Sequence, residues 1–377
     1  MTRIETLAVH AGGEPDETTG AVSPPIHMAT TFRHGPAGER QAGFEYQREG
    51  NPTQDRLETA LAALEGGQAA LCFGSGMAAM AAALESLPAG AHVLIPSDCY
   101  TGLRVLGAEF LPQRGITATA VDMADLGAVR AALRPETRMI WAETPSNPRL
   151  CVADIAALAA LAHGNDALLA CDNTFATPVL QRPLALGADL VMHSTTKYIG
   201  GHSDVMGGAL VFARRDPFHD SVFHRRHLTG GILAPFSAWL ILRGCRSLPA
   251  RMAWHCRNAA MLAQFLAQHE AVEAVHYPGL ATHPGHETAA RQMSDFGGML
   301  SLRIKGGRDA ALRVAGALDL AINATSLGGP ETLVEHRASI EGANAISPDN
   351  LLRVSVGLEH PDDLLADFPR ALGAAGA

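Results

Sequence analysis

The sequence is very poor in lysine. Of the 29 lysine and arginine residues in the 377-residue chain, two are lysines, Lys197 and Lys305. A genome that encodes arginine in preference to lysine accounts for the scarcity itself. Arginine cannot, however, replace lysine where a neutral amine must form an imine with a carbonyl. The surroundings of the two lysines are therefore informative.

Long apolar runs and paired cysteines are also missing. No stretch approaches the roughly 18 apolar residues that a membrane span needs, and the first residues carry early charge without an apolar run, which predicts no signal peptide. The cysteines are scattered without a CxxC pair. This usage is typical of reduced, buried thiols, so we predict a cytoplasmic protein.

The charge balance and the histidines exclude further classes. A net charge of −9 argues against nucleic acid or an anionic membrane as a partner. Of the histidines near the C-terminus, only His283 and His286 are close together, in a Pro/Gly loop with little carboxylate support. We therefore predict no metal site.

Apolar runs alternate with helical patterns over much of the chain. Strands are predicted at 69–73, 92–96, 117–121, 138–142, 167–171 and 189–193. Strand alternating with helix predicts an α/β fold with a mostly parallel sheet covered by helices on both faces. Ligands of such sheets bind at the carboxyl ends of the strands, where the polar clusters of this sequence fall.

The pattern changes at two places along the chain. Residues 1–50 show no sustained period and are predicted to form an irregular arm, and residues 51–243 carry the strand and helix alternation. Residues 244–377 combine long helical patterns with a few short strands. We predict a smaller C-terminal α+β domain there.

Several polar clusters have both a structural and a functional interpretation. The glycine turn Phe73–Met77 could bind a phosphate or merely make a tight turn. Asp172 follows an apolar strand, so it could cap a helix or hold a heterocycle nitrogen protonated. A P-loop is excluded, because neither lysine precedes Ser or Thr.

The two lysines have different surroundings. Lys305 lies at a predicted strand end and turn, which favours a surface position. Lys197 lies in a run of hydroxyl and glycine residues, with Ser194 and Thr196 beside it. Together with Asp172 and the flat ring of Tyr100, these parts match pyridoxal phosphate (PLP): phosphate cradle, Schiff-base lysine, pyridinium partner and stacking aromatic.

Longer motifs resemble those of a known protein family. The chain resembles the Cys/Met-metabolism (trans-sulfuration) family of fold-type I PLP-dependent enzymes nearly end to end. The resemblance is carried by Tyr46–Thr53, Gly74–Met77, Glu143–Pro148, Asp172–Phe175, Ser194–Asp204, Ser326–Gly329 and Leu352–Glu359.

The resemblance implies roles for the residues of the large domain, 51–243. Lys197 would carry PLP, Asp172 would pair with the pyridine nitrogen, Tyr100 would stack on the ring and Asn147 would contact its hydroxyl side. The phosphate would be held by the amides of Gly76 and Met77 and by the hydroxyls of Ser194 and Thr196.

The resemblance also implies an assembly and a substrate site. Tyr46 and Arg48, on the arm, would reach the phosphate of a neighbouring subunit, making a homodimer the minimal active unit, expected within a homotetramer. Arg353, with Ser326 nearby, would bind the α-carboxylate of an amino-acid substrate; a bidentate guanidinium suits that task.

The implied reaction is γ-replacement or γ-elimination on sulfur amino acids or O-acylhomoserine, of the cystathionine γ-synthase and γ-lyase type. The alternative is a cystathionine β-lyase or methionine γ-lyase type of C–S lyase. Ser326-Leu-Gly-Gly resembles the γ branch, since enteric β-lyases tend to carry Trp where Leu327 stands. Two hypotheses lie outside the trans-sulfuration enzymes: an aminotransferase, and a PLP-binding regulator without turnover.

The sequence departs from the family pattern at three places. The segment after Tyr100 is one residue short, which leaves the role of Arg104 open. Thr325 stands where Glu is frequent. Segment 335–342 reads Glu-His-Arg-Ala-Ser-Ile-Glu-Gly instead of a segment built on His-Pro-Ala-Ser-Met-Thr-His. These departures leave the substrate undecided.

Overall fold

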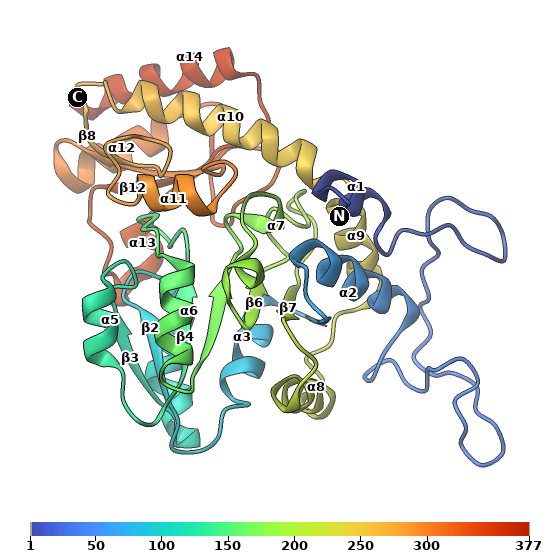
Figure 1. Ribbon diagram of the computed structural model, residues 1–377. Helices are drawn as coiled ribbons and strands as arrows, with labels where there is room; N and C mark the ends of the chain where they lie inside the picture. The colour runs from blue at the N-terminus through green and yellow to red at the C-terminus, as the bar shows by residue number, and fades with distance from the viewer. Residues whose placement is uncertain (1, 377) are drawn as a thin grey trace.

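The computed structural model describes residues 2–376 and contains two β-sheets surrounded by helices (Figure 1). The larger sheet has seven strands in the order β1-β7-β6-β5-β4-β2-β3. They are β1 (Ala69–Phe73), β2 (His92–Pro96), β3 (Thr117–Val121), β4 (Thr137–Glu143), β5 (Leu168–Asp172), β6 (Leu190–His193) and β7 (Gly208–Phe212). β7 pairs antiparallel with β1 and β6, and the other pairs are parallel. The predicted α/β fold with a mostly parallel sheet is confirmed; the prediction did not include β7.

Neighbouring residues of each central strand enter different hydrophobic cores. Ala170 of β5 belongs to the core on one face of the sheet, whereas Leu169 and Cys171 belong to a core on the opposite face. Alternation of this kind follows from the two-residue period of a strand. Both faces are apolar because both are covered, so the strands appear in the sequence as continuous apolar runs.

The helices that cover the larger sheet lie before, between and after its strands in sequence. They are α2 (Pro52–Glu65), α3 (Gly76–Leu84), α4 (Thr101–Val105), α5 (Leu126–Ala132), α6 (Ile155–His163), α7 (Thr177–Leu180), α8 (Pro217–Thr229) and α9 (Pro235–Cys245), with short turns η1 (Leu106–Phe110), η2 (Leu111–Arg114) and η3 (Pro183–Leu186). α2 shows how local sequence sets the ends: the Asn51 side chain accepts a hydrogen bond from the Thr53 N–H, and Gly66 ends the helix with a φ of 77°.

The second sheet has five strands in the order β10-β11-β12-β9-β8. They are β8 (Val272–His276), β9 (Met299–Ile304), β10 (Ile322–Asn323), β11 (Leu333–His336) and β12 (Leu351–Ser355). Around it lie α10 (Leu248–Leu266), α11 (His286–Gln292), α12 (Gly307–Ala317), α13 (Arg337–Glu341), η4 (Gly342–Asn344), α14 (Pro361–Leu372) and η5 (Gly373–Gly376). Residues of α10, α12 and α14 share one core with β9 and β12. The predicted division at 50/51 and 243/244 stays a prediction.

The N-terminal segment is mostly irregular. After α1 (Ile4–His10) the chain consists of turns, bends and isolated bridges until α2 begins. Figure 1 shows this stretch, in blue after the dark blue α1, extending outward from the rest of the molecule before it returns at α2.

Within residues 2–376 no helix is both long enough and apolar enough to cross a membrane.

Candidate active site

A cavity of about 410 Å³ opens where the strands of the larger sheet end. Its wall includes eight residues assigned to the cofactor from the sequence: Gly76, Met77, Tyr100, Asn147, Asp172, Ser194, Thr196 and Lys197. Asp172 is the last residue of β5, and the other residues follow β1, β2, β4 and β6. Parallel strands bring their carboxyl ends to one edge, and residues far apart in the sequence therefore meet there.

Lys197 presents its amine to this cavity from the turn after β6. Its Nζ donates a hydrogen bond to Ser326 Oγ at 2.8 Å. Burial, and next the positive charge of Arg353, lower the pKa of Lys197 from 10.5 to about 8. The lowered pKa increases the share of the amine that is neutral, and therefore nucleophilic, near neutral pH.

The loop that carries Ser326 lies directly against the lysine segment. Ser326 has a φ of 87° and Gly328 a φ of 78°. A Cβ added to Gly328 would lie 2.5 Å from the backbone nitrogen of Tyr198. Glycine is thus required at 328, and it allows the loop to bring the Ser326 hydroxyl to the amine.

Arg353 approaches the same loop from β12. It is buried, and it donates hydrogen bonds to the Ser326 carbonyl and to Asn147 Oδ1, both at 3.0 Å. Burial lowers the pKa of Arg353 to about 10, an effect that Glu335 opposes. The lysine amine and this guanidinium therefore contact the same residue, Ser326, at two different atoms.

Two buried carboxylates lie on the wall of the cavity, at the ends of neighbouring strands. Asp172 and Glu143 end adjacent strands and are partners in the β4–β5 register. Burial raises the pKa of both groups, and the negative charge of Asp172 raises the pKa of Glu143 further. Asp172 Oδ1 accepts from the Thr174 N–H at 2.9 Å and Glu143 Oε2 from the Tyr100 N–H at 2.9 Å. A positively charged ring nitrogen beside Asp172 would relieve this electrostatic cost.

The glycine turn before α3 supplies an anion site. Ser75 caps the helix by accepting from the Ala78 N–H at 3.1 Å. A Cβ at Gly76 would lie 3.0 Å from Ser194 Cβ and 3.1 Å from Ser194 Oγ. The absence of a side chain at 76 therefore leaves the helix N-terminus and the Ser194 hydroxyl open to one ligand.

Thr196 is also on the cavity wall, but its hydroxyl is already engaged. Thr196 Oγ1 donates to the Gly207 carbonyl at 3.1 Å and accepts from the Gly207 N–H at 3.0 Å. These bonds hold the turn between β6 and β7. One acceptor lone pair of the hydroxyl still remains for a ligand donor.

The residues on the cavity wall fit PLP. Lys197 offers an amine, Asp172 a carboxylate for the ring nitrogen, and Gly76 an open helix N-terminus for the phosphate. The contacts with the cofactor that were predicted for Lys197, Asp172, Tyr100, Asn147 and the phosphate ligands all stay predictions. In the part of the chain that the structure describes, no group of three or more His, Cys, Asp or Glu side chains could hold a metal ion.

Tyr46 and Arg48 are not on the wall of this cavity. They lie on the arm, where the Arg48 guanidinium is 5.1 Å from the centre of the Tyr46 ring and Tyr46 is 44 % exposed. Within one chain they do not complete the site, and their predicted contact with a neighbouring subunit stays a prediction.

Sequence reasoning missed three charged residues near the site. Glu143 was quoted within a motif but given no role, although it ends a strand as Asp172 does. Glu335 and Arg337 were noticed only as part of a departure from the family pattern. In the structure Glu335 forms ion pairs with both Arg337 and Arg353.

Comparisons of the sequence with known proteins agree with the geometry. The family described as "Cys/Met metabolism PLP-dependent enzyme" matches residues 5–373. The cystathionine γ-synthase of Mycobacterium tuberculosis is 49 % identical over 374 residues, covering 98 % of this chain and 96 % of the relative. The cystathionine β-lyase of Lactococcus lactis is 43 % identical over 380 residues, covering 99 % of each.

Solved structures give the same result. The chain superposes on the metB protein of Corynebacterium glutamicum with a TM-score of 0.96 at 43 % identity, covering 99 % of this chain and 98 % of the other. It superposes on a cystathionine γ-lyase from Lactobacillus plantarum complexed with L-serine with a TM-score of 0.94 at 41 % identity, covering 100 % of each. The chain therefore belongs to the Cys/Met-metabolism family of PLP-dependent enzymes.

Proposed function

We propose that the protein cleaves or replaces the bond at Cγ of a sulfur amino acid or an O-acylhomoserine, as a cystathionine γ-synthase or γ-lyase does. One observation carries the choice of an α-amino acid as substrate. The Lys197 amine and the Arg353 guanidinium both contact Ser326. An α-amino acid carries its amine and its carboxylate on one carbon, so it can reach both groups together.

In this proposal each side chain has a distinct task. Arg353 binds the α-carboxylate through charge-assisted hydrogen bonds, which replace its present hydrogen bonds to two neutral oxygens. Lys197, with its lowered pKa, removes the Cα proton. Tyr100, on the cavity wall, donates or accepts a proton at the leaving group. PLP, when bound, supplies the electron sink for the negative charge that develops at Cα.

The choice of the γ-carbon is supported by Leu327 and by the relatives. Leu327 lies on the cavity wall, where enteric β-lyases tend to carry Trp. Relatives named cystathionine γ-synthase reach 48–49 % identity. β-Elimination is the second candidate, because relatives named cystathionine β-lyase align over the same length at 41–43 % identity.

Product analysis distinguishes these reactions. The protein loaded with PLP is incubated with cystathionine, and separately with an O-acylhomoserine plus cysteine. New cystathionine identifies γ-replacement, 2-oxobutyrate identifies γ-elimination and pyruvate identifies β-elimination. We expect new cystathionine or 2-oxobutyrate; pyruvate as the main product would replace the proposal by its alternative.

We further propose a cytoplasmic homodimer as the minimal active unit, assembled into a homotetramer. Residues 1–50 act as the arm that brings Tyr46 and Arg48 to the neighbouring subunit, residues 51–243 hold the cofactor and residues 244–377 form the smaller domain. The outward path of the arm supports this arrangement (Figure 1).

A further inference from the structure

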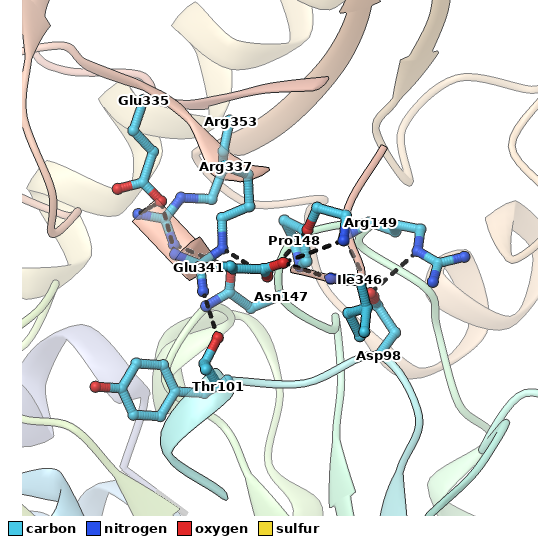
Figure 2. Close-up of polar contacts among 12 residues, drawn as sticks. Asp98, Thr101, Asn147, Pro148, Arg149, Glu335, Arg337, Glu341, Ile346 and Arg353 are labelled. Carbon is cyan, nitrogen blue, oxygen red and sulfur yellow. Dashed lines mark hydrogen bonds and ion pairs between the residues drawn. The ribbon is translucent and has the colours of Figure 1, made fainter. Parts of the chain in front are cut away.

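Arg337 is a buried arginine held by three different elements. It begins α13 and is 5 % exposed. Its Nη1 donates to Glu335 Oε1 at 2.8 Å, its Nε to Glu341 Oε1 at 3.2 Å and its Nη2 to Thr101 Oγ1 at 3.2 Å. Figure 2 shows its guanidinium between Glu335 and Thr101. The side chain thus connects the second sheet to the helix that follows Tyr100.

Glu335 is shared between two arginines. Its Oε1 accepts the hydrogen bond from Arg337 and lies 3.0 Å from Arg353 Nη2. Glu335 is 1 % exposed, and within the described residues its Oε2 has no hydrogen-bond partner. A buried carboxylate in this position needs a cation, and Arg337 supplies one.

The hydrogen bonds of Arg353 differ from those of Arg337. Arg353 donates to two neutral oxygens, Asn147 Oδ1 and the Ser326 carbonyl. Hydrogen bonds to a carboxylate are roughly twice as strong as those to neutral acceptors. The carboxylate of a substrate can therefore displace the two neutral acceptors of Arg353. Glu335, 3.0 Å from Arg353 Nη2, would compete with that carboxylate more strongly if Arg337 did not also hold it.

We propose that Arg337 is a positioning residue that holds Glu335 and thereby keeps Arg353 available for the carboxylate of the substrate. This inference rests on the proposed function, since it takes Arg353 as the carboxylate site. With Arg337 in place, two guanidiniums share one Glu335 oxygen and Arg353 keeps part of its positive charge uncompensated. Without Arg337, Glu335 would pair with Arg353 alone and would compete with the substrate carboxylate for its guanidinium.

Of the two carboxylates that Arg337 contacts, Glu335 is the one that would lose most of its compensating charge if Arg337 were removed. Glu341 retains other donors, because its Oε2 accepts from the N–H groups of Ile346 and Ser347 at 2.9 and 3.1 Å. Glu335, in contrast, contacts only Arg337 and Arg353 as cations among the described residues. Neutralising Glu335 should therefore undo the effect of removing Arg337.

The test is the binding of two matched ligands to the PLP-loaded protein, followed by the change in the visible absorbance of the cofactor. L-2-Aminobutyrate carries an amine and a carboxylate but no leaving group, and propylamine is the same molecule without the carboxylate. We expect Arg337→Met to raise the dissociation constant of L-2-aminobutyrate about 10- to 100-fold. The dissociation constant of propylamine should stay unchanged.

A double variant separates this role from a structural one. Glu335→Gln combined with Arg337→Met should restore binding of L-2-aminobutyrate toward that of the unaltered protein, since the competing charge is gone. An Arg337→Met variant that binds both ligands as the unaltered protein does, or a double variant that fails to recover, would overturn the inference. Glu335→Gln alone should bind L-2-aminobutyrate at least as tightly, and this keeps the test decisive if Arg337→Met does not fold; weaker binding would contradict the proposal.

Two further variants complete the experiment. Arg308→Met is the matched control, because exposed Arg308 contacts the same helix through Ser339 at 3.0 Å without touching Glu335. It should leave both dissociation constants unchanged, and an effect equal to that of Arg337→Met would sink the inference.

Arg353→Met should weaken binding of L-2-aminobutyrate alone. If it does not, Arg353 is not the carboxylate site and both proposals fall, whereas a loss in Arg353→Met without one in Arg337→Met overturns the inference only.

Discussion

At the scale of single residues, burial gives Lys197 the properties of a reactive amine. It is surrounded by the apolar and polar wall of the cavity, and its pKa falls from 10.5 to about 8. Desolvation disfavours the charged form, and the nearby Arg353 acts in the same direction. Lys305 is exposed and offers a natural comparison, because it is the other lysine of the chain.

The lowered pKa predicts how the rate of PLP attachment depends on pH. Only the neutral amine attacks the aldehyde, so the rate constant for adding PLP to the cofactor-free protein should rise with pH and level off above about 8. Stopped-flow absorbance measures this rate. A rise that continues to a midpoint near 10.5, the ordinary value for lysine, would show that burial does not act on this amine.

Asp172 permits a second prediction at this scale. Asp172→Asn removes the negative charge that we propose pairs with the ring nitrogen of the cofactor, and it keeps the shape of the side chain. We expect kcat to fall about 100- to 1,000-fold, because a fixed charge aimed at the reacting group is lost. Steady-state kinetics at saturating PLP tests this, and an Asp189→Asn variant, outside the cavity, is the control. A kcat within a few-fold of the unaltered value would contradict the role of Asp172.

At the scale of elements, the edge of the larger sheet and one loop of the second sheet build the site together. β4, β5 and β6 place Glu143, Asp172 and the Lys197 turn at one edge. The loop from Ser326 to Gly329 reaches this edge from the other sheet, and its close approach depends on Gly328. The site therefore depends on how the two sheets are packed.

Gly328→Ala tests that dependence. The new methyl group would lie 2.5 Å from the Tyr198 nitrogen, and the backbone has a φ of 78°. We expect a loss of stability of about 1–3 kcal/mol together with a higher KM, because the Ser326 hydroxyl moves away from the lysine. Gly316→Ala, where a Cβ meets no atom within 4 Å, is the control and should not lower the melting temperature. Equal behaviour of the two variants would argue against the loop contact.

Much of the fold and of the cavity wall could be predicted from local sequence, because strands, glycine turns and the Lys197 segment are local features. The contacts made by Arg337 could not. Its partner Thr101 is 236 residues away in the sequence, and no period or turn signal connects the two. β7 escaped prediction because no helix separates it from β6, so it lies outside the alternation of strand and helix from which the other strands were predicted.

At the scale of the whole molecule, the exposed arm suggests that a single chain does not complete the site. Tyr46 and Arg48 lie away from the cavity of their own chain, on a segment that extends outward (Figure 1). A closed, symmetric dimer would place each arm at the site of the other chain.

Mixing two inactive variants tests this arrangement. One variant carries Lys197→Ala, and the other carries Tyr46→Ala with Arg48→Ala. After unfolding and refolding together in equal amounts, half of the dimers are mixed and each has one intact site, so we expect about a quarter of the original activity. Separate refolding of each variant is the control. Failure of the mixture to regain activity, with both variants shown to co-assemble, would place the arm in its own subunit.

We propose that Lys197 carries the cofactor, and because the chain has only two lysines the attachment site can be measured directly. The PLP-loaded protein is reduced with borohydride, digested and mapped by mass spectrometry. We expect loss of the visible absorbance and a phosphopyridoxyl group on Lys197, which should be absent from a Lys197→Ala variant and retained in a Lys305→Ala variant. A pyridoxyl group on Lys305, or a colourless protein with full activity, would contradict it.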